Sequence, residues 1–394
     1  MPASTDEITV QAADAPVAVT RATPPRDLYI DSLRSIMTAF VILHHTAITY
    51  GAIGGWFWYE IKPSHALSSQ ILILFCTINQ AYFMGFFFLL AAYFTPGSLQ
   101  RKGYTRFIGD RFLRLGVPLL AFIVILGPLT AAMAHAADTG RFWETFPYIA
   151  THVILIPGPL WFAEALLIFS LAYCAWRAAF GAPLAAQRVP RPIPRGRAWI
   201  LSALLTGLAA LAIRQFIPVG VNIAALQLGY FATYIVLFAV GIAAWRFDWL
   251  RQLHWKNARL GIITAFVVLP LMAIGVAVSR TLDGDKGNFG GGISWQSVLY
   301  ALWEPFVAWG LIAAWLLIMR RYGNQPSAVW SWLNRRAYAV YIIHPPVLVG
   351  ISVLLHPWIA PALLKFATTG SLACIATWLL ADPLVRVPGI RRVV

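Results

Sequence analysis

Charged residues are scarce in this chain: Asp, Glu, Lys and Arg together account for 11% of its 394 residues. Hydrophobic residues account for 59%. So few polar side chains cannot cover the surface of a soluble globule of this length. The composition therefore excludes a soluble globular protein and predicts an integral membrane protein that is surrounded by the lipid bilayer.

Cysteine is also rare. The three cysteines, Cys76, Cys174 and Cys374, lie singly in apolar stretches and form no C-x-x-C pair. This spacing excludes a disulfide framework, so we interpret the cysteines as packing residues. Histidine and carboxylate residues form no cluster with the spacing of metal ligands, and we expect no bound metal.

Basic residues outnumber acidic ones two to one, with 30 Lys and Arg against 15 Asp and Glu and a net charge of +15. A basic chain binds nucleic acid when its charges form one continuous patch. Here the arginines occur instead in short loops between apolar stretches. We therefore expect no nucleic-acid partner and interpret these loops as signals that orient the chain in the membrane.

Ten apolar stretches are each long enough to cross the roughly 30 Å of hydrocarbon in a bilayer as an α-helix. We predict an all-α integral membrane protein, a bundle of about ten transmembrane helices, in one membrane domain over residues 28–382. Residues 1–27, rich in Ala, Pro and Thr, are predicted to be a disordered cytoplasmic tail, and residues 383–394 a basic cytoplasmic tail. The predicted helices cover residues 28–51, 68–94, 112–136, 158–180, 198–217, 225–245, 259–280, 295–319, 335–356 and 361–382.

The basic residues fall mainly in every second loop. Lys and Arg near helix ends accumulate on the cytoplasmic side of a membrane, so these loops and both termini are predicted to be cytoplasmic. The intervening loops are assigned few basic residues, among them Arg214. The basic loops contain Arg101, Lys102 and Arg106; Arg188, Arg191, Arg195 and Arg197; Arg246, Arg251 and Lys256; Arg320, Arg321 and Arg335; and Arg386, Arg391 and Arg392.

One face of the first predicted helix carries an arginine and a histidine. Arg34 and His45 are eleven residues apart, which brings their side chains to within about 20° of each other, about 16 Å apart along the axis. Adjacent His44 points about 100° away. Ionisable groups inside hydrocarbon mark a site by default, and a neutral imidazole can accept a proton from a hydroxyl. His45 is therefore a candidate general base, although a histidine that only forms hydrogen bonds within the bundle fits the same pattern.

Basic residues near the cytoplasmic ends of the first and third predicted helices form a second candidate site. Arg34 lies one turn after Asp31, so it either pairs with that carboxylate or contacts an anionic ligand, and the two roles are compatible. Arg111 and Arg114 are three positions apart on one face. Their planar guanidinium groups bind phosphate oxygens bidentately, which favours a phosphate site, while anchoring of the helix end is the alternative.

Aromatic and polar residues on two other helices are further candidates. Trp161 and Glu164 open the fourth predicted helix on the external side, where a ring and a carboxylate suit a sugar. Trp161 fits an interfacial aromatic belt equally. In the ninth predicted helix, Tyr338, Tyr341 and His344 follow at intervals of three.

A pair of prolines, Pro345-Pro346, directly follows His344. We expect these prolines to break the ninth predicted helix. Structural hydrogen bonding near the resulting kink is then an alternative to a functional role for the tyrosines and the histidine before them.

Taken in order, these motifs resemble the membrane acyltransferase-3 family, the multi-span bacterial O-acyltransferases that modify cell-surface sugars. The short chain and the absence of an appended esterase-like domain are similar to the glucan-modifying members. The ordered set spans nearly the whole chain and is specific, although each piece alone is not. The matching pieces are Asp31-x-x-Arg34 with His45 and Tyr50 after it, Phe86 to Tyr93, Arg101 to Phe107 leading to Arg111-x-x-Arg114, Leu160-Trp161-Phe162, and Tyr341-Ile-Ile-His344-Pro345.

The resemblance implies a reaction and a role for each matching residue. It implies acyl-CoA as cytoplasmic co-substrate, with acetyl-CoA or succinyl-CoA as the donor, and no permanently bound cofactor. The acceptor would be a carbohydrate hydroxyl across the bacterial inner membrane. At the matching positions, His45 is the catalytic histidine, Arg34 its companion, and Arg111 and Arg114 bind the donor. Supporting or acceptor-side roles are expected for Asp31, Tyr50, Trp161, Glu164, Tyr341 and His344.

The same residues permit a second interpretation, a transporter or channel with a proton or solute path through His45, Arg34 and Glu164. That class predicts paired broken helices in two related halves, which the sequence does not show. The sequence leaves open the acyl group, the acceptor glycan and the oligomeric state. It also leaves open whether His45 acts as a base or carries the acyl group covalently.

Overall fold

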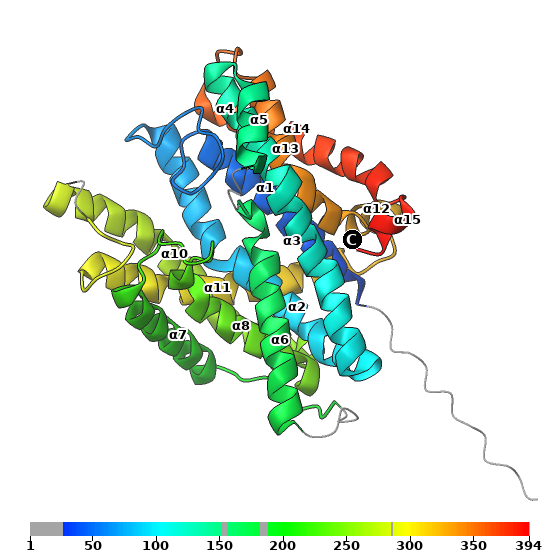
Figure 1. The fold of residues 1–394 in the computed structure, drawn as a ribbon. Helices are drawn as coiled ribbons and strands as arrows, with labels where there is room; N and C mark the ends of the chain where they lie inside the picture. Colours follow the sequence, from blue (N-terminus) through cyan, green and yellow to red (C-terminus); the bar gives the residue numbers. More distant parts are fainter. Residues whose placement is uncertain (1–26, 152–155, 182–187, 285–286, 394) are drawn as a thin grey trace, which may run out of the picture.

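The computed structural model describes residues 27–151, 156–181, 188–284 and 287–393. Within these residues the chain is almost entirely helical, and β-type pairing is confined to two isolated bridges, Tyr50–Ile61 and Ile223–Leu226. The predicted all-α class is confirmed (Figure 1). Of the predicted N-terminal tail, residues 1–26 lie outside the described residues.

Eight helical segments of the described chain are long and apolar enough to cross a membrane, as an integral membrane protein requires. One of them, Leu67–Thr139, contains both the second and the third predicted helices. The first predicted helix is α1, Leu28–Thr49. It is not one of these eight segments, because Arg34, His44 and His45 make it less apolar than they are. The other segments contain α6 (Trp161–Phe180), α7 (Arg197–Phe216), α8 (Phe231–Phe247), α10 (Trp255–Asp283), α11 (Trp295–Tyr322), α13 (Ala337–Leu354) and α14 (Ala362–Leu384).

The chain turns sharply within α2, Leu67–Arg111. Gly103 has φ +71° and ψ 174° there, a backbone conformation that residues with a side chain rarely adopt. After the turn the second leg runs back along the bundle (Figure 1). It passes through two π-helical turns, Phe112–Gly116 and Phe122–Leu126, on either side of α3 (Val117–Ala121), and ends with α4 (Gly127–Thr139).

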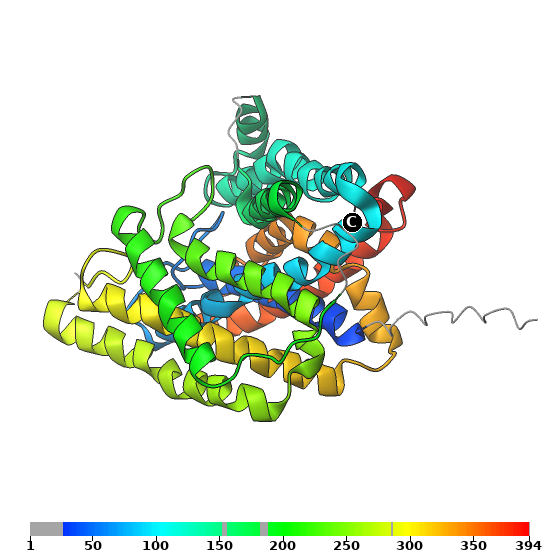
Figure 2. The ribbon, with the colours of Figure 1, turned by 90° about the horizontal axis from the view of Figure 1, so that it is seen from below.

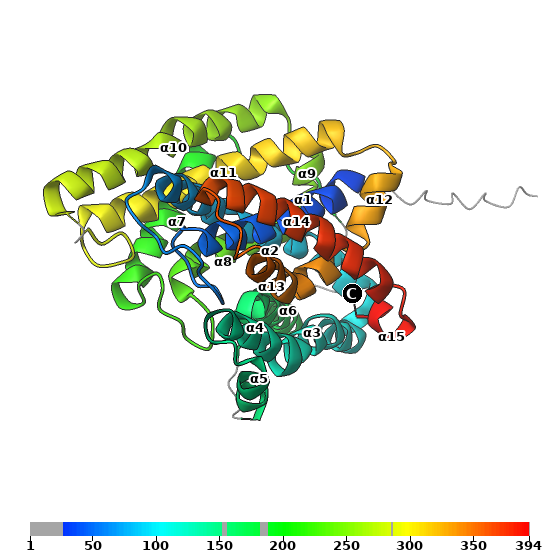
Figure 3. The ribbon, with the colours of Figure 1, turned by 90° about the horizontal axis from the view of Figure 1, so that it is seen from above.

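Helix α1 lies at the centre of the bundle. It packs against α2, α11, α13 and α14 (Figure 3). Helices α10 and α11 lie side by side at one edge, and the segment from α3 to α5 (Phe142–Thr151) lies at the opposite edge (Figure 2). Side chains of α1 therefore face interior surfaces on several sides. The short helices are α9 (Trp249–Gln252), α12 (Ala328–Asn334) and α15 (Pro388–Arg391), the last of which falls within the predicted C-terminal tail.

The paired prolines of α13 do not break the helix. Pro345 and Pro346 both lie inside the continuous helix α13, so the expectation of a break is wrong. Pro345 has no N–H to donate to the carbonyl of Tyr341, four residues earlier. The Nδ1–H of His344 donates to this carbonyl instead, over 2.7 Å. The side chain thereby satisfies a backbone group that would otherwise lack a partner inside the bundle.

A buried ion pair joins three helices. Arg214 of α7 pairs with Glu304 of α11, and the hydroxyl of Thr233 of α8 donates a hydrogen bond of 2.9 Å to the same carboxylate. The two charged side chains are 0% and 1% exposed. The assignment of Arg214 to an external loop is therefore wrong: the arginine lies inside the bundle because Glu304 neutralises its charge.

We predict that Glu304→Ala strongly destabilises the fold. The substitution leaves the guanidinium of Arg214 buried without its carboxylate, which costs about 3–5 kcal/mol. Thermal unfolding of the detergent-purified protein should show a clearly lower melting temperature. The matched control is Glu144→Ala, which removes the exposed pair with Arg141 and should change the stability by less than about 1 kcal/mol. Equal melting temperatures for the wild type and Glu304→Ala would contradict the importance of the buried pair.

Candidate active site

Two cavities inside the bundle contain most of the residues that the sequence singles out. The larger one, the basic cavity, has a volume of about 520 Å³. Its walls come from α1, α2, α6, α13 and the π-helical turn Phe112–Gly116. Its basic lining residues are Arg34, Arg101, Lys102, Arg111, Arg114 and Arg335.

The basic cavity carries an excess of positive charge. Its six basic side chains are accompanied by two carboxylates among the lining residues, Asp31 and Asp110. Asp31 lies 4.0 Å from Arg34, and Asp110 lies 2.8 Å from Lys102 and 3.3 Å from Arg114. These pairs hold the cationic side chains in place without neutralising all of them. The cavity is therefore suited to an anionic ligand.

The predicted arginine pair lies in this cavity. The guanidinium of Arg111 packs over Phe107, with 4.8 Å between Cζ and the ring centroid. Its buried Nε has no hydrogen-bond partner within the described residues. The backbone carbonyl of Arg114 accepts a hydrogen bond of 2.5 Å from the hydroxyl of Tyr338. Pro118 lacks the N–H that a regular helix would direct at this carbonyl.

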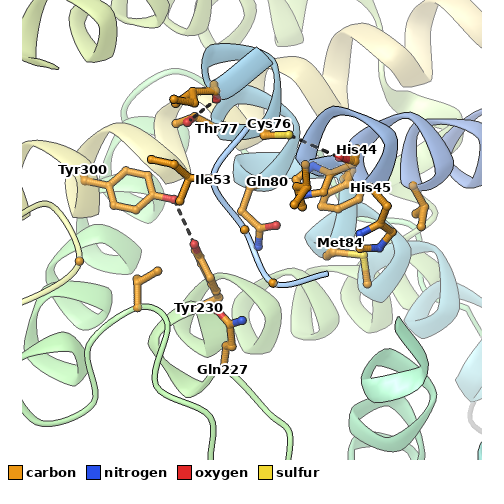
Figure 4. A pocket seen from close by; sticks show the side chains of 18 of the residues that line it. His44, His45, Ile53, Cys76, Thr77, Gln80, Met84, Gln227, Tyr230 and Tyr300 are labelled. Atoms are coloured by element: carbon orange, nitrogen blue, oxygen red, sulfur yellow. Dashed lines mark hydrogen bonds between the residues drawn. The ribbon is translucent and has the colours of Figure 1, made fainter. Parts of the chain in front are cut away.

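The second cavity, the histidine cavity, has a volume of about 370 Å³ and is lined by both histidines of α1, His44 and His45. Figure 4 shows these histidines at one end and Tyr230 and Tyr300 at the other, with Gln80 between them. The two tyrosine hydroxyls lie 3.3 Å apart. The cavity thus combines imidazole groups with aromatic rings and an amide. Further aromatic lining residues are Phe83, Trp161, Tyr234 and Phe289.

His45 lies in a stack of nearly parallel rings. Its ring centroid is 4.0 Å from that of Trp56, at an interplanar angle of 15°, and 5.5 Å from that of His344, at 16°. Trp56 belongs to the segment between α1 and α2, and Ile53 and Gly54 of the same segment line the histidine cavity. The buried Nδ1 of His45 has no hydrogen-bond partner among the described residues. The hydrogen-bonding capacity of this nitrogen is therefore not used by the described protein groups.

The hydrogen bond from His344 to the carbonyl of Tyr341 determines which nitrogen of His344 carries the proton. A carbonyl oxygen can only accept, so Nδ1 is the protonated nitrogen and Nε2 of the neutral ring presents a lone pair. Nε2 is buried and unpartnered in the described part of the chain. His344 thus places a second basic nitrogen beside His45.

A row of rings on α13, the aromatic ladder of Tyr338, Tyr341 and His344, lies between the two cavities. Tyr338 and Tyr341 line the basic cavity, with ring centroids 6.4 Å apart. The rings of Tyr341 and His344 are 6.0 Å apart, and His344 stacks on His45. Arg34 and His45 lie on one face of α1 by helical spacing, but they line separate cavities with the aromatic ladder packed between them.

Three further predicted residues lie in different places. Trp161 lines the histidine cavity and stacks on Tyr234, with 5.8 Å between centroids. Tyr50, at the end of α1, forms a hydrogen bond of 2.9 Å with Thr369 of α14. Glu164 is half-buried on α6 and is not among the lining residues of either cavity. The structure therefore brings Trp161 to the candidate site but not Tyr50 or Glu164.

Sequence reasoning missed several residues that line the histidine cavity or stack on His45. His44 also lines the histidine cavity, and its Nδ1 lies 3.4 Å from Nδ2 of Asn79. Trp56 is signalled only by an aromatic run at residues 56–59, directly after the first helix. Tyr230 and Tyr300 carry no local signal, because tertiary packing alone brings them together.

Within the described residues, no group of three or more His, Cys, Asp or Glu side chains is placed to hold a metal ion.

The fold and these cavities define a multi-span membrane protein with a site inside its helix bundle. The chain belongs to the acyltransferase-3 family, because residues 27–382 match the family's acyltransferase domain. It is 23% identical over 369 residues to glucans biosynthesis protein C of Salmonella paratyphi B, and the match covers 87% of each chain. The protein of the same name from Salmonella paratyphi A is 23% identical over 371 residues, again with 87% of each chain covered. No solved structure matches at a significant level.

These matches confirm the predicted family and the similarity to glucans biosynthesis protein C. The protein is thus a membrane acyltransferase.

We predict that Trp56→Ala lowers the rate of acyl transfer about two- to tenfold, because an aromatic stacking pair contributes about 0.5–1.5 kcal/mol. Loss of the stack would allow the ring of His45 to adopt other orientations. The rate is measured as transfer of labelled acyl groups by membrane vesicles that contain the protein. The matched control is Trp143→Ala, whose side chain is 83% exposed and whose loss should leave the rate unchanged. A folded Trp56→Ala variant with the wild-type rate would rule out a role for the stack.

Proposed function

We propose that this protein is an O-acyltransferase that moves an acetyl or succinyl group from cytoplasmic acyl-CoA to a hydroxyl of a periplasmic or cell-surface carbohydrate. Membership of the acyltransferase-3 family supports the transfer itself. The observation that carries the proposal is the basic cavity beside the histidine cavity, with the aromatic ladder between them. An anionic donor and a hydroxyl acceptor would then approach His45 from opposite sides.

The charge of the basic cavity supports acyl-CoA as the donor. Coenzyme A carries several phosphate groups, and guanidinium groups bind phosphate oxygens bidentately. Arg111 and Arg114 would hold the phosphates, and Arg34 would contact the pantetheine arm on its way to His45. Because basic loops favour the cytoplasmic side, the proposal also places this cavity toward the cytoplasm of a bacterial inner membrane.

In the proposed reaction, His45 activates the acceptor hydroxyl. The hydroxyl oxygen bonds to the thioester carbonyl carbon while His45 takes the hydroxyl proton. The carbon–sulfur bond then breaks, and the proton passes to the departing sulfur of coenzyme A. In the covalent route, a ring nitrogen of His45 first bonds to the thioester carbonyl carbon while the carbon–sulfur bond breaks. The hydroxyl oxygen then displaces this nitrogen from the carbonyl carbon, and the hydroxyl proton passes to the thiolate of coenzyme A. Exclusion of water from the cavity would suppress hydrolysis of the thioester.

The lining of the histidine cavity supports a carbohydrate as the acceptor. Aromatic rings suit the apolar face of a sugar, and a few placed polar groups fix its orientation. Trp161, Tyr230 and Tyr300 supply rings, while Gln80 and Gln227 supply amides. The name of the related glucans biosynthesis protein C favours a glucan among carbohydrates.

We predict that His45→Ala lowers acyl transfer at least about 100-fold, since a positioned acid–base group contributes about 10²–10⁴-fold. The assay follows release of free coenzyme A in the presence of a glucan oligosaccharide. Thermal unfolding checks that the variant folds. The control is His135→Ala, which removes an exposed histidine of α4 and should keep the wild-type rate. Wild-type activity in folded His45→Ala would exclude both the base and the covalent role.

We predict that Arg114→Ala raises the KM for acyl-CoA about tenfold or more and changes kcat little, because a hydrogen bond to a charged group contributes about 1.5–3 kcal/mol. Alanine retains the backbone carbonyl that Tyr338 requires. The matched control is Arg106→Ala, an exposed arginine of α2 that is not among the lining residues of the basic cavity. An unchanged KM in Arg114→Ala would remove this residue from the donor site.

A further inference from the structure

A third cavity lies between α7, α8 and α11 and has a volume of about 320 Å³. Among the described residues it shares no lining residue with the basic cavity or the histidine cavity. Its walls are almost entirely apolar, with Leu237, Trp309 and Ala313 among them. The cavity therefore stands apart from the candidate active site and calls for a different ligand.

Most polar side-chain groups in the wall of this cavity already have protein partners; among the described residues the exception is the buried Nε1 of Trp249. Ser202 is the one lining residue with a hydroxyl, and its Oγ accepts a hydrogen bond of 2.6 Å from Nε1 of Trp309. The same hydroxyl donates to the carbonyl of Trp199 over 3.1 Å. Nε1 of Trp199 donates to the carbonyl of Pro194 over 2.6 Å. Apart from Nε1 of Trp249, the cavity therefore offers an occupant apolar surface rather than hydrogen-bonding groups.

The opening of the cavity is basic. Pro194 and Ala198 line the cavity and are exposed, so they mark its opening. Arg195 and Arg197 lie between them in the sequence and are exposed as well. An exposed apolar lining flanked by two cations matches an amphiphile with an apolar chain and an anionic head.

The segment that carries these arginines is tied to the bundle. The backbone N–H of Val189 donates to the carbonyl of Arg246 over 2.9 Å, and that of Arg191 donates to the carbonyl of Phe247 over 3.3 Å. The side chain of Gln252 donates to the carbonyl of Arg191 over 3.1 Å. The segment that carries the cations at the opening is thus held beside α8 and α9.

We propose that this cavity binds one acyl chain of an anionic phospholipid from the surrounding bilayer, with the lipid phosphate on Arg195 and Arg197. Clusters of basic residues at a membrane surface attract anionic lipid head groups, and guanidinium groups bind phosphate oxygens bidentately. The bound acyl chain covers the apolar wall of the cavity and removes it from contact with water. This binding is independent of the acyl donor and of the transfer reaction.

Native mass spectrometry of the full-length protein in detergent tests the proposal. The protein is titrated with phosphatidylglycerol and with phosphatidylcholine that carry the same acyl chains. We expect one tightly bound phosphatidylglycerol and weaker binding of phosphatidylcholine. The double variant Arg195→Gln/Arg197→Gln should weaken phosphatidylglycerol binding about 25-fold, since each surface arginine contributes a factor of about five. The matched control, Arg106→Gln/Arg392→Gln, removes the same charge from exposed positions elsewhere and should leave the affinity unchanged.

Occupation of the cavity by the chain is tested separately. In Ala313→Phe, the larger side chain occupies the cavity from its wall and should abolish tight phosphatidylglycerol binding. Thermal unfolding checks that this variant folds. Phosphatidylglycerol with short acyl chains should bind the wild type much more weakly than the long-chain lipid, a comparison that needs no variant. Equal affinity for long- and short-chain lipids, equal affinity for the two head groups, or equal weakening by the control variant would overturn the proposal.

Discussion

A backbone carbonyl that lacks a hydrogen-bond donor is costly inside a membrane, and this constraint shapes the candidate site. Prolines inside helices free several carbonyls, and two of these, the carbonyls of Arg114 and Tyr341, accept hydrogen bonds from side chains of α13. The hydroxyl of Tyr338 donates to the first, and Nδ1–H of His344 donates to the second. The same bonds hold the aromatic ladder in position and leave Nε2 of His344 unprotonated. Both the helices and the positions of these site side chains therefore depend on the need to give each buried carbonyl a hydrogen-bond donor.

A buried ion pair supports the end of the histidine cavity that lies opposite the histidines. The Arg214 guanidinium pairs with Glu304, and its Cζ lies 5.4 Å and 4.9 Å from the ring centroids of Tyr230 and Tyr300. Its Nε also donates to the carbonyl of Gly229 over 2.9 Å. The ion pair thus supports the two tyrosines that close the cavity opposite the histidines. The pair of Arg214 and Glu304 therefore affects both the stability of the fold and the shape of the proposed acceptor site.

The length of the apolar stretches and the spacing of residues along a helix account for what the sequence predicted correctly. Ten apolar stretches lie on helices of the structure, because hydrocarbon permits few alternatives to a helix. Spacing within single helices also placed Arg111 and Arg114 together, and the structure adds Arg34 to the same cavity. The distance between helices is not encoded in such spacing, so the placement of Arg34 and His45 in two separate cavities emerged only from the packing.

Other features depend on partners that are remote in the sequence. Arg214 resembles a loop residue until Glu304, 90 positions later, is placed beside it. Pro345 predicts a break, but a side-chain donor one residue before it preserves the helix. Trp56 reaches His45 because the segment after α1 folds back over the end of that helix. In each case tertiary contacts overrule a local signal.

The most direct test of the account is the side of the membrane on which each substrate acts. Sealed proteoliposomes that contain the full-length protein are loaded with a glucan oligosaccharide and supplied from outside with labelled acetyl-CoA or succinyl-CoA. The account predicts labelled glucan inside the liposomes, and none when the protein is His45→Ala. Labelling that occurs only when donor and glucan share one side of the membrane would contradict transfer through the bundle.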